Sequence, residues 1–295
     1  MKPSSVLLAL LSTGAIGAVA WCGYGTLQQY QAHEQARTEA STRAKAAAEA
    51  TWEIFKTILN ANREAVARLA ADPAVTKAWN NNDRPALAKA VSGFLSKNGV
   101  EGWVTVIGKD GKVFYSSDAP DRFGYSVVEQ VPELAHVLAD SRYGHYSGAL
   151  TPTQNKLLCL GNMQNFADAS GVVALSEPLN DDFLLKLQQE LQSRSAIQGI
   201  DLVAFNIENN HVQGCTPLLK KNDHGYLLKL RREGLGAVKS PAATFEECDR
   251  VWRCIPLMRA EGLRTPGVVI AGAAVTVESP ARQTSVDKPA DKTPQ

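Results

Sequence analysis

The chain has 295 residues, more than one domain usually contains, so we expect two modules. Hydrophobic residues make up 44% of it and charged residues 21%, proportions typical of a packed protein. The formal net charge is +1 and no basic stripe stands out, which argues against a nucleic-acid-binding surface.

Residues 1–27 contain an uninterrupted run of apolar and small residues from Val6 to Gly25. A helix of this length, rising about 1.5 Å per residue, matches the roughly 30 Å hydrocarbon core of a membrane. The alternative is a cleaved secretory signal, because Ala18-Val19-Ala20 fits the cleavage pattern. Since helix-forming sequence continues past the run, we predict an uncleaved anchor in the inner membrane, with the bulk of the chain periplasmic.

The segment 28–98 is expected to hold a long helix and a helical lead-in to a sheet. No proline or glycine interrupts Gln28 to Asp72, and good helix formers dominate. Spacings of three and four residues give one seam, formed by Trp52, Phe55, Leu59, Asn62, Val66 and Leu69. The seam packs either on the helix's own domain or against a second copy in a parallel homodimer.

Asp72-Pro73 is expected to end the long helix, because the residue before a proline disfavours the helical conformation. A short apolar turn at 74–79 follows. A second amphipathic helix is predicted from Pro85 to about Lys97, with Asp83 placed to cap its start and Asn98-Gly99 to close it.

The segment 99–179 reads as a first β-rich module. The runs Trp103–Ile107 and Val113–Ser116 flank Asp110-Gly111, which favours a tight hairpin turn because glycine tolerates positive φ. A short helix is predicted at 132–140 and strands at 143–150, 156–163 and 171–176. This order predicts a five-stranded antiparallel sheet with helices on one face, an α+β arrangement.

The segment 180–278 repeats that order, with helices at 180–193 and 218–233 and strands at 199–206, 211–215, 243–247, 251–257 and 268–277. Gly102 and Gly199, at the two hairpin starts, are 97 positions apart, and Gly171 and Gly267, at the last strands, are 96 apart. Matched offsets at both ends predict two copies of one module. The tail 279–295 is polar and contains proline, so we expect it to be disordered.

Three stretches together resemble the double Cache sensory domains of bacterial receptors. They are Leu69-Ala70-Ala71-Asp72-Pro73-Ala74-Val75, Lys109-Asp110-Gly111-Lys112, and Gly171-Val172-Val173-Ala174-Leu175-Ser176-Glu177-Pro178-Leu179. The resemblance covers about residues 28–278 and implies two tandem PAS-like modules packed along the N-terminal helix. It also implies a small ligand in the first, membrane-distal module, between sheet and loop layer, with the second module nearer the membrane.

The sequence departs from that family after Val277. Family receptors usually continue into a second membrane span and an output domain, whereas the residues here are few and polar. We therefore expect ligand state to pass through the long helix to a partner signalling protein.

Sequence motifs typical of catalytic, nucleotide-binding or metal-binding sites are not found. The sequence has no G-x-S-x-G, H-E-x-x-H or P-loop, and its five histidines lack metal-ligand spacing. We predict that the protein is not an enzyme and holds no metal or cofactor. The exported cysteines are either buried thiols or include one disulfide, between Cys248 and Cys254 or between Cys215 and either of them.

The first module carries a polar and aromatic set without a counterpart in the second: Tyr115, Asp118, Arg122, Tyr125, Tyr143, His145, Tyr146 and Asn162. Ligand pockets are mostly apolar with a few converging polar groups, so we predict that this set lines the ligand site. The alternative is that these residues lie at strand edges and in loops, with their rings packed and their polar groups exposed to solvent.

The sequence therefore favours a membrane-anchored extracytoplasmic sensor that binds a small molecule and relays its state to a partner protein. The first alternative is a non-catalytic envelope structural or assembly protein that uses PAS-like modules for protein contacts. An enzyme with an unrecognised site is the third hypothesis.

Overall fold

The computed structural model describes residues 3–128, 131–139, 144–150, 158–194, 197–207, 211–217, 229–230, 232–233, 244–247, 249–257 and 267–275. For residues 3–25 and for Pro132, His136, Leu150 and Val268, the description covers the backbone alone. Residues 41–274 form one compact unit, which contains both sheets described below.

Three helices precede the first sheet: α1 (Pro3–Ala70), α2 (Pro73–Asn80) and α3 (Arg84–Asn98). The carboxylate of Asp72 accepts hydrogen bonds from the backbone N–H groups of Ala74 (2.8 Å) and Val75 (3.2 Å). With Pro73 in the first turn, this cap starts a helix. The predicted apolar turn at 74–79 is therefore wrong, because the Asp-Pro pair that ends α1 also begins α2.

The caps of α3 follow the prediction. The Asp83 carboxylate accepts a hydrogen bond from the backbone N–H of Ala86 at 3.0 Å. Gly99 ends the helix in the left-handed conformation, with φ of 60°.

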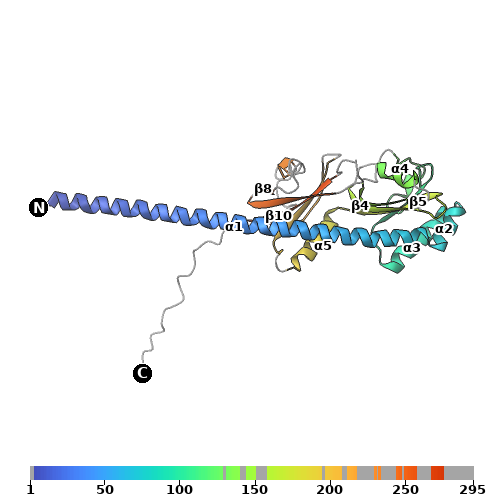
Figure 1. Cartoon of the computed structure of the whole chain (residues 1–295), viewed down its shortest axis with the longest axis horizontal. Helices are drawn as coiled ribbons and strands as arrows, with labels where there is room; N and C mark the ends of the chain where they lie inside the picture. Colours follow the sequence, from blue (N-terminus) through green and yellow to red (C-terminus); the bar gives the residue numbers. More distant parts are fainter. Residues whose placement is uncertain are drawn as a thin grey trace, which may run out of the picture. The chain divides into compact units, whose positions relative to one another are not determined.

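The first sheet and its short helices are β1 (Trp103–Gly108), β2 (Val113–Ser116), η1 (Pro120–Arg122), α4 (Pro132–Ala139), β3 (His145–Leu150), β4 (Cys159–Asn165) and β5 (Gly171–Pro178). All neighbouring strands are antiparallel, in the order β2-β1-β5-β4-β3. α1 covers one face of this sheet and α4 the other (Figure 1).

The second sheet and the helix before it are α5 (Asp181–Gln192), β6 (Ile200–Asn206), β7 (His211–Cys215), β8 (Thr244–Glu247), β9 (Arg250–Pro256) and β10 (Gly267–Ala274). Its antiparallel order, β7-β6-β10-β9-β8, repeats that of the first sheet. The predicted α+β fold, a long N-terminal helix with two five-stranded antiparallel sheets, is confirmed (Figure 1).

The seam of α1 packs inside the chain's own fold. Phe55, Asn62, Val66 and Leu69 are each at most 8% exposed. Val66 and Leu69 join the core of the first sheet, and the ring of Phe55 lies 6.2 Å from that of Phe183 in α5. Four of the six seam residues therefore pack on the helix's own domain, whereas Trp52 and Leu59 are half-buried.

The predicted anchor, Val6–Gly25, belongs to the part of α1 whose side chains are not described. Within the described residues, none of the helices is both long and apolar enough to cross a membrane. The predicted tail 279–295 also lies outside the described residues, and the predicted helix 218–233 is described at 229–230 and 232–233, where it is helical.

Cys159, Cys215 and Cys254 are buried thiols. Strand register links Cys215 to Val203, Val203 to Ile270 and Ile270 to Cys254, so three strand spacings, about 14 Å, separate the two cysteines. A disulfide needs Cα atoms about 4.4–6.8 Å apart. Of the possible disulfides, the pairing of Cys215 with Cys254 is therefore excluded, and Cys248 lies outside the described residues.

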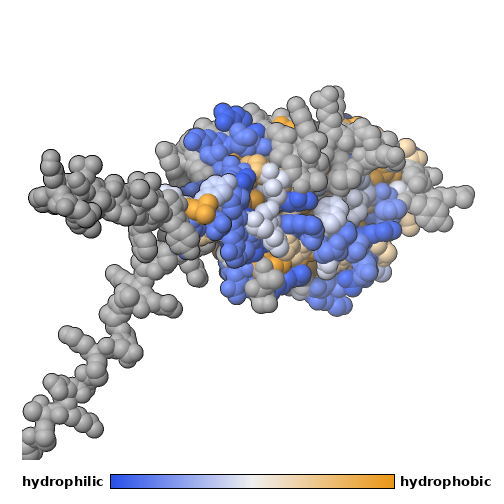
Figure 2. All heavy atoms as spheres, turned by 60° about the vertical axis from the view of Figure 1, so that its left-hand side comes forward, coloured by the Kyte–Doolittle hydropathy of each residue, from blue (hydrophilic) through white to orange (hydrophobic). Residues whose placement is uncertain are grey.

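On the face shown in Figure 2, the described surface is mainly hydrophilic, and its apolar areas are small. Large apolar side chains that are more than half exposed are Leu27, Tyr30, Phe123 and Tyr125.

Candidate functional site

Strand alternation divides the side chains of the first sheet between two faces. Val104, Val106 and Leu175 pack with residues of α1, α2 and α3, and we call this side the helix face. Met163 and Ala174 pack with residues of α4, and we call this side the α4 face. Because directly paired residues on antiparallel strands share a face, the strand register assigns the remaining residues.

One row of paired residues crosses all five strands on the α4 face: Ser116, Thr105, Ala174, Met163 and Tyr146. The hydroxyl oxygens of Ser116 and Thr105, both buried, lie 3.3 Å apart. Ser116 Oγ also donates a hydrogen bond to Asp118 Oδ1 at 2.5 Å. This end of the row is therefore a buried polar cluster on an otherwise apolar face.

The neighbouring row on the same face is built mostly from small residues. Trp103 pairs with Ser176, Ser176 with Gly161, and Gly161 with Gly148. We call these four residues the glycine row. Ser176, Gly161 and Gly148 are buried, and the two glycines add no side-chain bulk above β4 and β3. Glycine inside a strand often marks a place where a ligand or another backbone approaches closely.

The second sheet has a corresponding row. Its long ladder starts at Gly267 paired with Asn206, as the first starts at Gly171 paired with Gly108. Five residues after Gly171, β5 reaches Ser176, and five residues after Gly267, β10 reaches Gly272. The full row of the second sheet is Asp201, Gly272, Trp252 and Phe245, in the places of Trp103, Ser176, Gly161 and Gly148.

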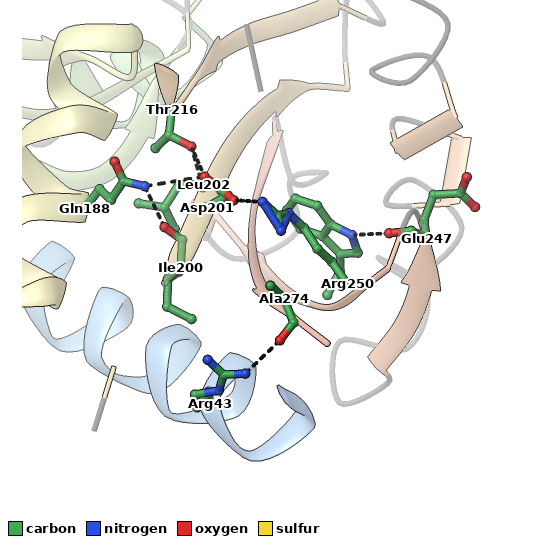
Figure 3. A network of polar contacts seen from close by, with 10 residues as sticks. Arg43, Gln188, Ile200, Asp201, Leu202, Thr216, Glu247, Arg250 and Ala274 are labelled. Carbon is green, nitrogen blue, oxygen red and sulfur yellow. Dashed lines mark hydrogen bonds and ion pairs between the residues drawn. The ribbon is translucent and has the colours of Figure 1, made fainter. Parts of the chain in front are cut away.

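That second row is filled by an aromatic ring and an ion pair (Figure 3). The carboxylate of buried Asp201 lies 2.5 Å from the guanidinium of Arg250 and accepts a hydrogen bond from Thr216 Oγ1 at 3.0 Å. The indole of Trp252 is fully buried, and its Nε1 donates to the carbonyl oxygen of Glu247 at 3.1 Å. The first sheet carries glycines where the second carries its largest side chains.

Asp118 accepts a hydrogen bond from Ser116, which belongs to the row next to the glycine row. Burial raises the pKa of the Cys159 thiol, and the charges of Asp118 and Glu177 raise it further. Cys159 lies two residues before Gly161 on the same strand and face, so the field of Asp118 reaches this part of the sheet. Burial, and to a smaller extent the negative charge of Asp118, also raises the pKa of the Tyr115 hydroxyl. We define the candidate site as Thr105, Ser116, Asp118 and the glycine row.

The structure separates the predicted ligand residues. Asp118 belongs to the candidate site, and Tyr146 lies on the α4 face, where its hydroxyl donates to the carbonyl oxygen of Ala149 at 2.9 Å. Strand register places Tyr115, His145 and Asn162 on the helix face instead.

The other three predicted residues lie outside the sheet. Arg122 is buried in η1. Tyr125 is 51% exposed in the loop that follows. Tyr143 lies outside the described residues.

Sequence reasoning missed Thr105, Ser116, Ser176, Gly148 and Gly161. Each is a small residue inside a run that reads as a strand, where β-branched and aromatic residues are favoured. Alternation alone puts Thr105 on the face opposite Val104 and Val106, so the pattern was present in the sequence. Aligning the two repeats strand by strand would have matched Gly161 with Trp252.

A separate groove of about 250 Å³ lies between α1 and β9. Its lining is mainly apolar and comes from Ala48, Glu49, Trp52, Arg253, Cys254, Ile255 and Pro256. It belongs to the second sheet, and the glycine row has no residue in it. Among the described residues, no group of three or more His, Cys, Asp or Glu side chains is arranged to hold a metal ion.

No protein-family model matches the sequence, and a search of curated proteins finds no match. Among solved structures, the periplasmic domain of LuxQ from Vibrio cholerae is 13% identical with a TM-score of 0.51, and the match covers 78% of this chain and 99% of that domain. This similarity shows a shared fold and confirms the double Cache-like architecture that the sequence motifs predicted.

Two further matches have lower TM-scores. An extracellular ligand binding receptor from Desulfohalobium retbaense DSM5692 is 8% identical with a TM-score of 0.47, and the match covers 78% of this chain but spans 40% of the receptor's length. The ligand-binding domain of the Campylobacter jejuni chemoreceptor Tlp3, solved in complex with 4-methylisoleucine, is 13% identical with a TM-score of 0.47, covering 86% of this chain and 96% of that one.

Proposed function

We propose that this chain is an extracytoplasmic sensor that binds a small molecule over the glycine row of its first sheet. One observation carries the proposal. The two sheets have the same strand order, yet the positions that Trp252 and Phe245 occupy in the second are Gly161 and Gly148 in the first. A small-molecule site requires space that side chains do not fill, next to buried polar groups that can contact the ligand.

The polar groups around the row fit ligand recognition. The carboxylate of Asp118 accepts hydrogen bonds, and the hydroxyls of Thr105, Ser116 and Ser176 both donate and accept them. The ring of Tyr146 extends the apolar part of the same face. In this proposal the groups recognise a ligand without transforming it, so the protein is not an enzyme.

The proposed location follows from the N-terminal run. We place Val6–Gly25 in the inner membrane and the sheets on its outer side. α1 is one helix from Pro3 to Ala70, so it is the element through which ligand state would reach a partner signalling protein. A homodimer through α1 would have to use its exposed side, because Phe55, Val66 and Leu69 are buried in the chain itself.

A thermal-shift screen of the full-length chain in detergent tests the proposal. The compounds are amino acids, organic acids, amines and purines. A ligand at about 100 times its Kd stabilises the folded state by roughly 2.7 kcal/mol, so a binder raises the Tm clearly.

Two variants locate the binding. Asp118→Ala should abolish the Tm rise caused by a hit, whereas Ser147→Ala, an exposed residue on the helix face, should keep it. An unchanged response of Asp118→Ala would refute the proposed site. A screen without any hit would refute small-molecule sensing and favour the protein-contact role in the envelope.

A further inference from the structure

Two buried asparagine side chains have polar atoms that make no hydrogen bond with the described residues. Asn162, on β4, is 0% exposed, and neither its Oδ1 nor its Nδ2 has a partner. Asn62, on α1, is 8% exposed, and its Nδ2 has no partner with hydrogen-bond geometry. A buried polar atom without a hydrogen-bond partner destabilises the folded state, so these three atoms demand an explanation.

Both amides lie in the contact between α1 and the first sheet. Asn162 pairs with Leu175, which packs with Ala65 and Val66 of α1. Asn62 lies three and four residues before Ala65 and Val66, hence on the same side of the helix. The unsatisfied atoms therefore belong to one interface.

Glu177 ties the two asparagines together. It follows Leu175 by two residues on β5, so its side chain lies on the same face, diagonal to Asn162. The Asn62 amide lies near enough to this carboxyl group to lower its pKa, although burial raises that pKa more strongly. Polar side chains from α1, β4 and β5 thus share one helix–sheet contact, and the charges of Glu101 and Lys186 also act on Glu177.

We propose that Asn62, Asn162 and Glu177 form a buried hydration site, in which ordered water bridges α1 to the first sheet. Water is the ligand that suits this set, because amide and carboxyl groups supply both donors and acceptors and a buried water needs two to four polar partners. The contact of α1 is then dry at Val66 and Leu69 and hydrated one turn earlier. The proposal is independent of what binds over the glycine row.

A double-substitution cycle in the full-length chain tests the bridge. Asn162→Leu and Asn62→Leu replace the amides with apolar groups of similar size. If water bridges them, each single substitution lowers the Tm. The decrease in Tm of the double variant is then clearly smaller than the sum of the two single decreases, because the first substitution already breaks the water bridge that the second would break. Asn98→Leu, at an exposed residue of α3, is the control and should add independently to Asn162→Leu.

Additive effects of Asn62→Leu and Asn162→Leu would overturn the proposal, and so would a rise in Tm for Asn162→Leu alone. Should the variants fail to fold, the unaltered chain still decides. Magnetisation transfer between a long-lived water and the side-chain amide protons of both Asn62 and Asn162, observed by NMR, is the expected result. Its absence at both amides would exclude the bridging water.

Discussion

The six-membered ring of Trp252 lies directly over the Cα atom of Gly272. A Cβ atom added at Gly272 would come within 2.4 to 2.6 Å of three atoms of that ring, a separation that real Cβ atoms do not tolerate. The indole is fully buried and held by its hydrogen bond to Glu247, so it has nowhere to move. The glycine at position 272 is therefore required by Trp252, the residue paired directly with it across β9 and β10.

Gly272→Ala should consequently destabilise the protein by about 1–3 kcal/mol, the usual cost of forcing an extra methyl group into a packed core. Chemical denaturation monitored by Trp fluorescence measures this. Gly93→Ala is the matched control, because no atom outside the helix's own backbone and the adjoining residues lies within 4 Å of the added Cβ in the exposed middle of α3. There alanine should stabilise by up to about 1 kcal/mol, since it is the better helix former. Equal effects at both positions would contradict the packing described for Trp252.

The ion pair between Asp201 and Arg250 gives a second prediction. Asp201 is 1% exposed, so Arg250→Ala leaves a buried carboxylate without its counter-charge. Breaking such a pair costs about 3–5 kcal/mol. Lys56→Ala removes an ion pair with Glu53 that is also short, at 2.7 Å. Both of its side chains are exposed, so the expected loss is below about 1 kcal/mol. Similar losses for the two variants, compared by urea denaturation, would show that the buried pair is not important for stability.

Glu177 predicts a pH dependence. Burial raises its pKa in the folded protein above the ordinary value, so the folded state binds this proton more tightly than the unfolded state. The stabilisation that comes from protonated Glu177 is therefore fully present below the ordinary glutamate pKa. It is lost as the pH rises through the raised pKa of the folded state. Glu177→Gln, which stays neutral, should raise the Tm at pH 7, and this gain should shrink as the pH falls toward about 4.5.

The control for that prediction is Glu64→Gln, on the exposed side of α1, where the change in stability should stay within about 0.5 kcal/mol. Melting temperatures recorded between pH 4 and pH 8 give the comparison. A Glu177→Gln variant that is less stable than the parent at pH 7 would mean that the charged carboxylate is favoured at this position.

The architecture could be predicted because its determinants are local. Asp110-Gly111 sets the first hairpin, and Gly171 and Gly267 mark the same point in both sheets. Gly199 lies one residue before Ile200, which is the register counterpart of Gly102. The helix α2 was missed because Asp72-Pro73 was interpreted as an end alone, although the same pair supplies an N-cap and a first-turn proline.

The candidate site could be predicted less well, because a site on a sheet depends on which face each residue occupies. Tyr115 and Ser116 are neighbours in sequence but lie on opposite faces. A bulge between Val106 and Ile107 leaves Phe114 as the extra residue of β2, and such a shift cannot be read from composition. Aromatic and charged residues are the usual sequence signal of a ligand site, whereas this site is marked by the absence of side chains at Gly148 and Gly161.

The most direct test of small-molecule binding over the glycine row is to give the first sheet the packing of the second. Gly161→Trp combined with Ser176→Gly reproduces the relationship between Trp252 and Gly272 at the corresponding positions. Isothermal titration calorimetry with a compound from the thermal-shift screen should detect binding to the parent chain and none to the double variant. The variant should unfold cooperatively, with a Tm no lower than that of Gly161→Trp alone. Undiminished affinity in a folded double variant would contradict the proposed site.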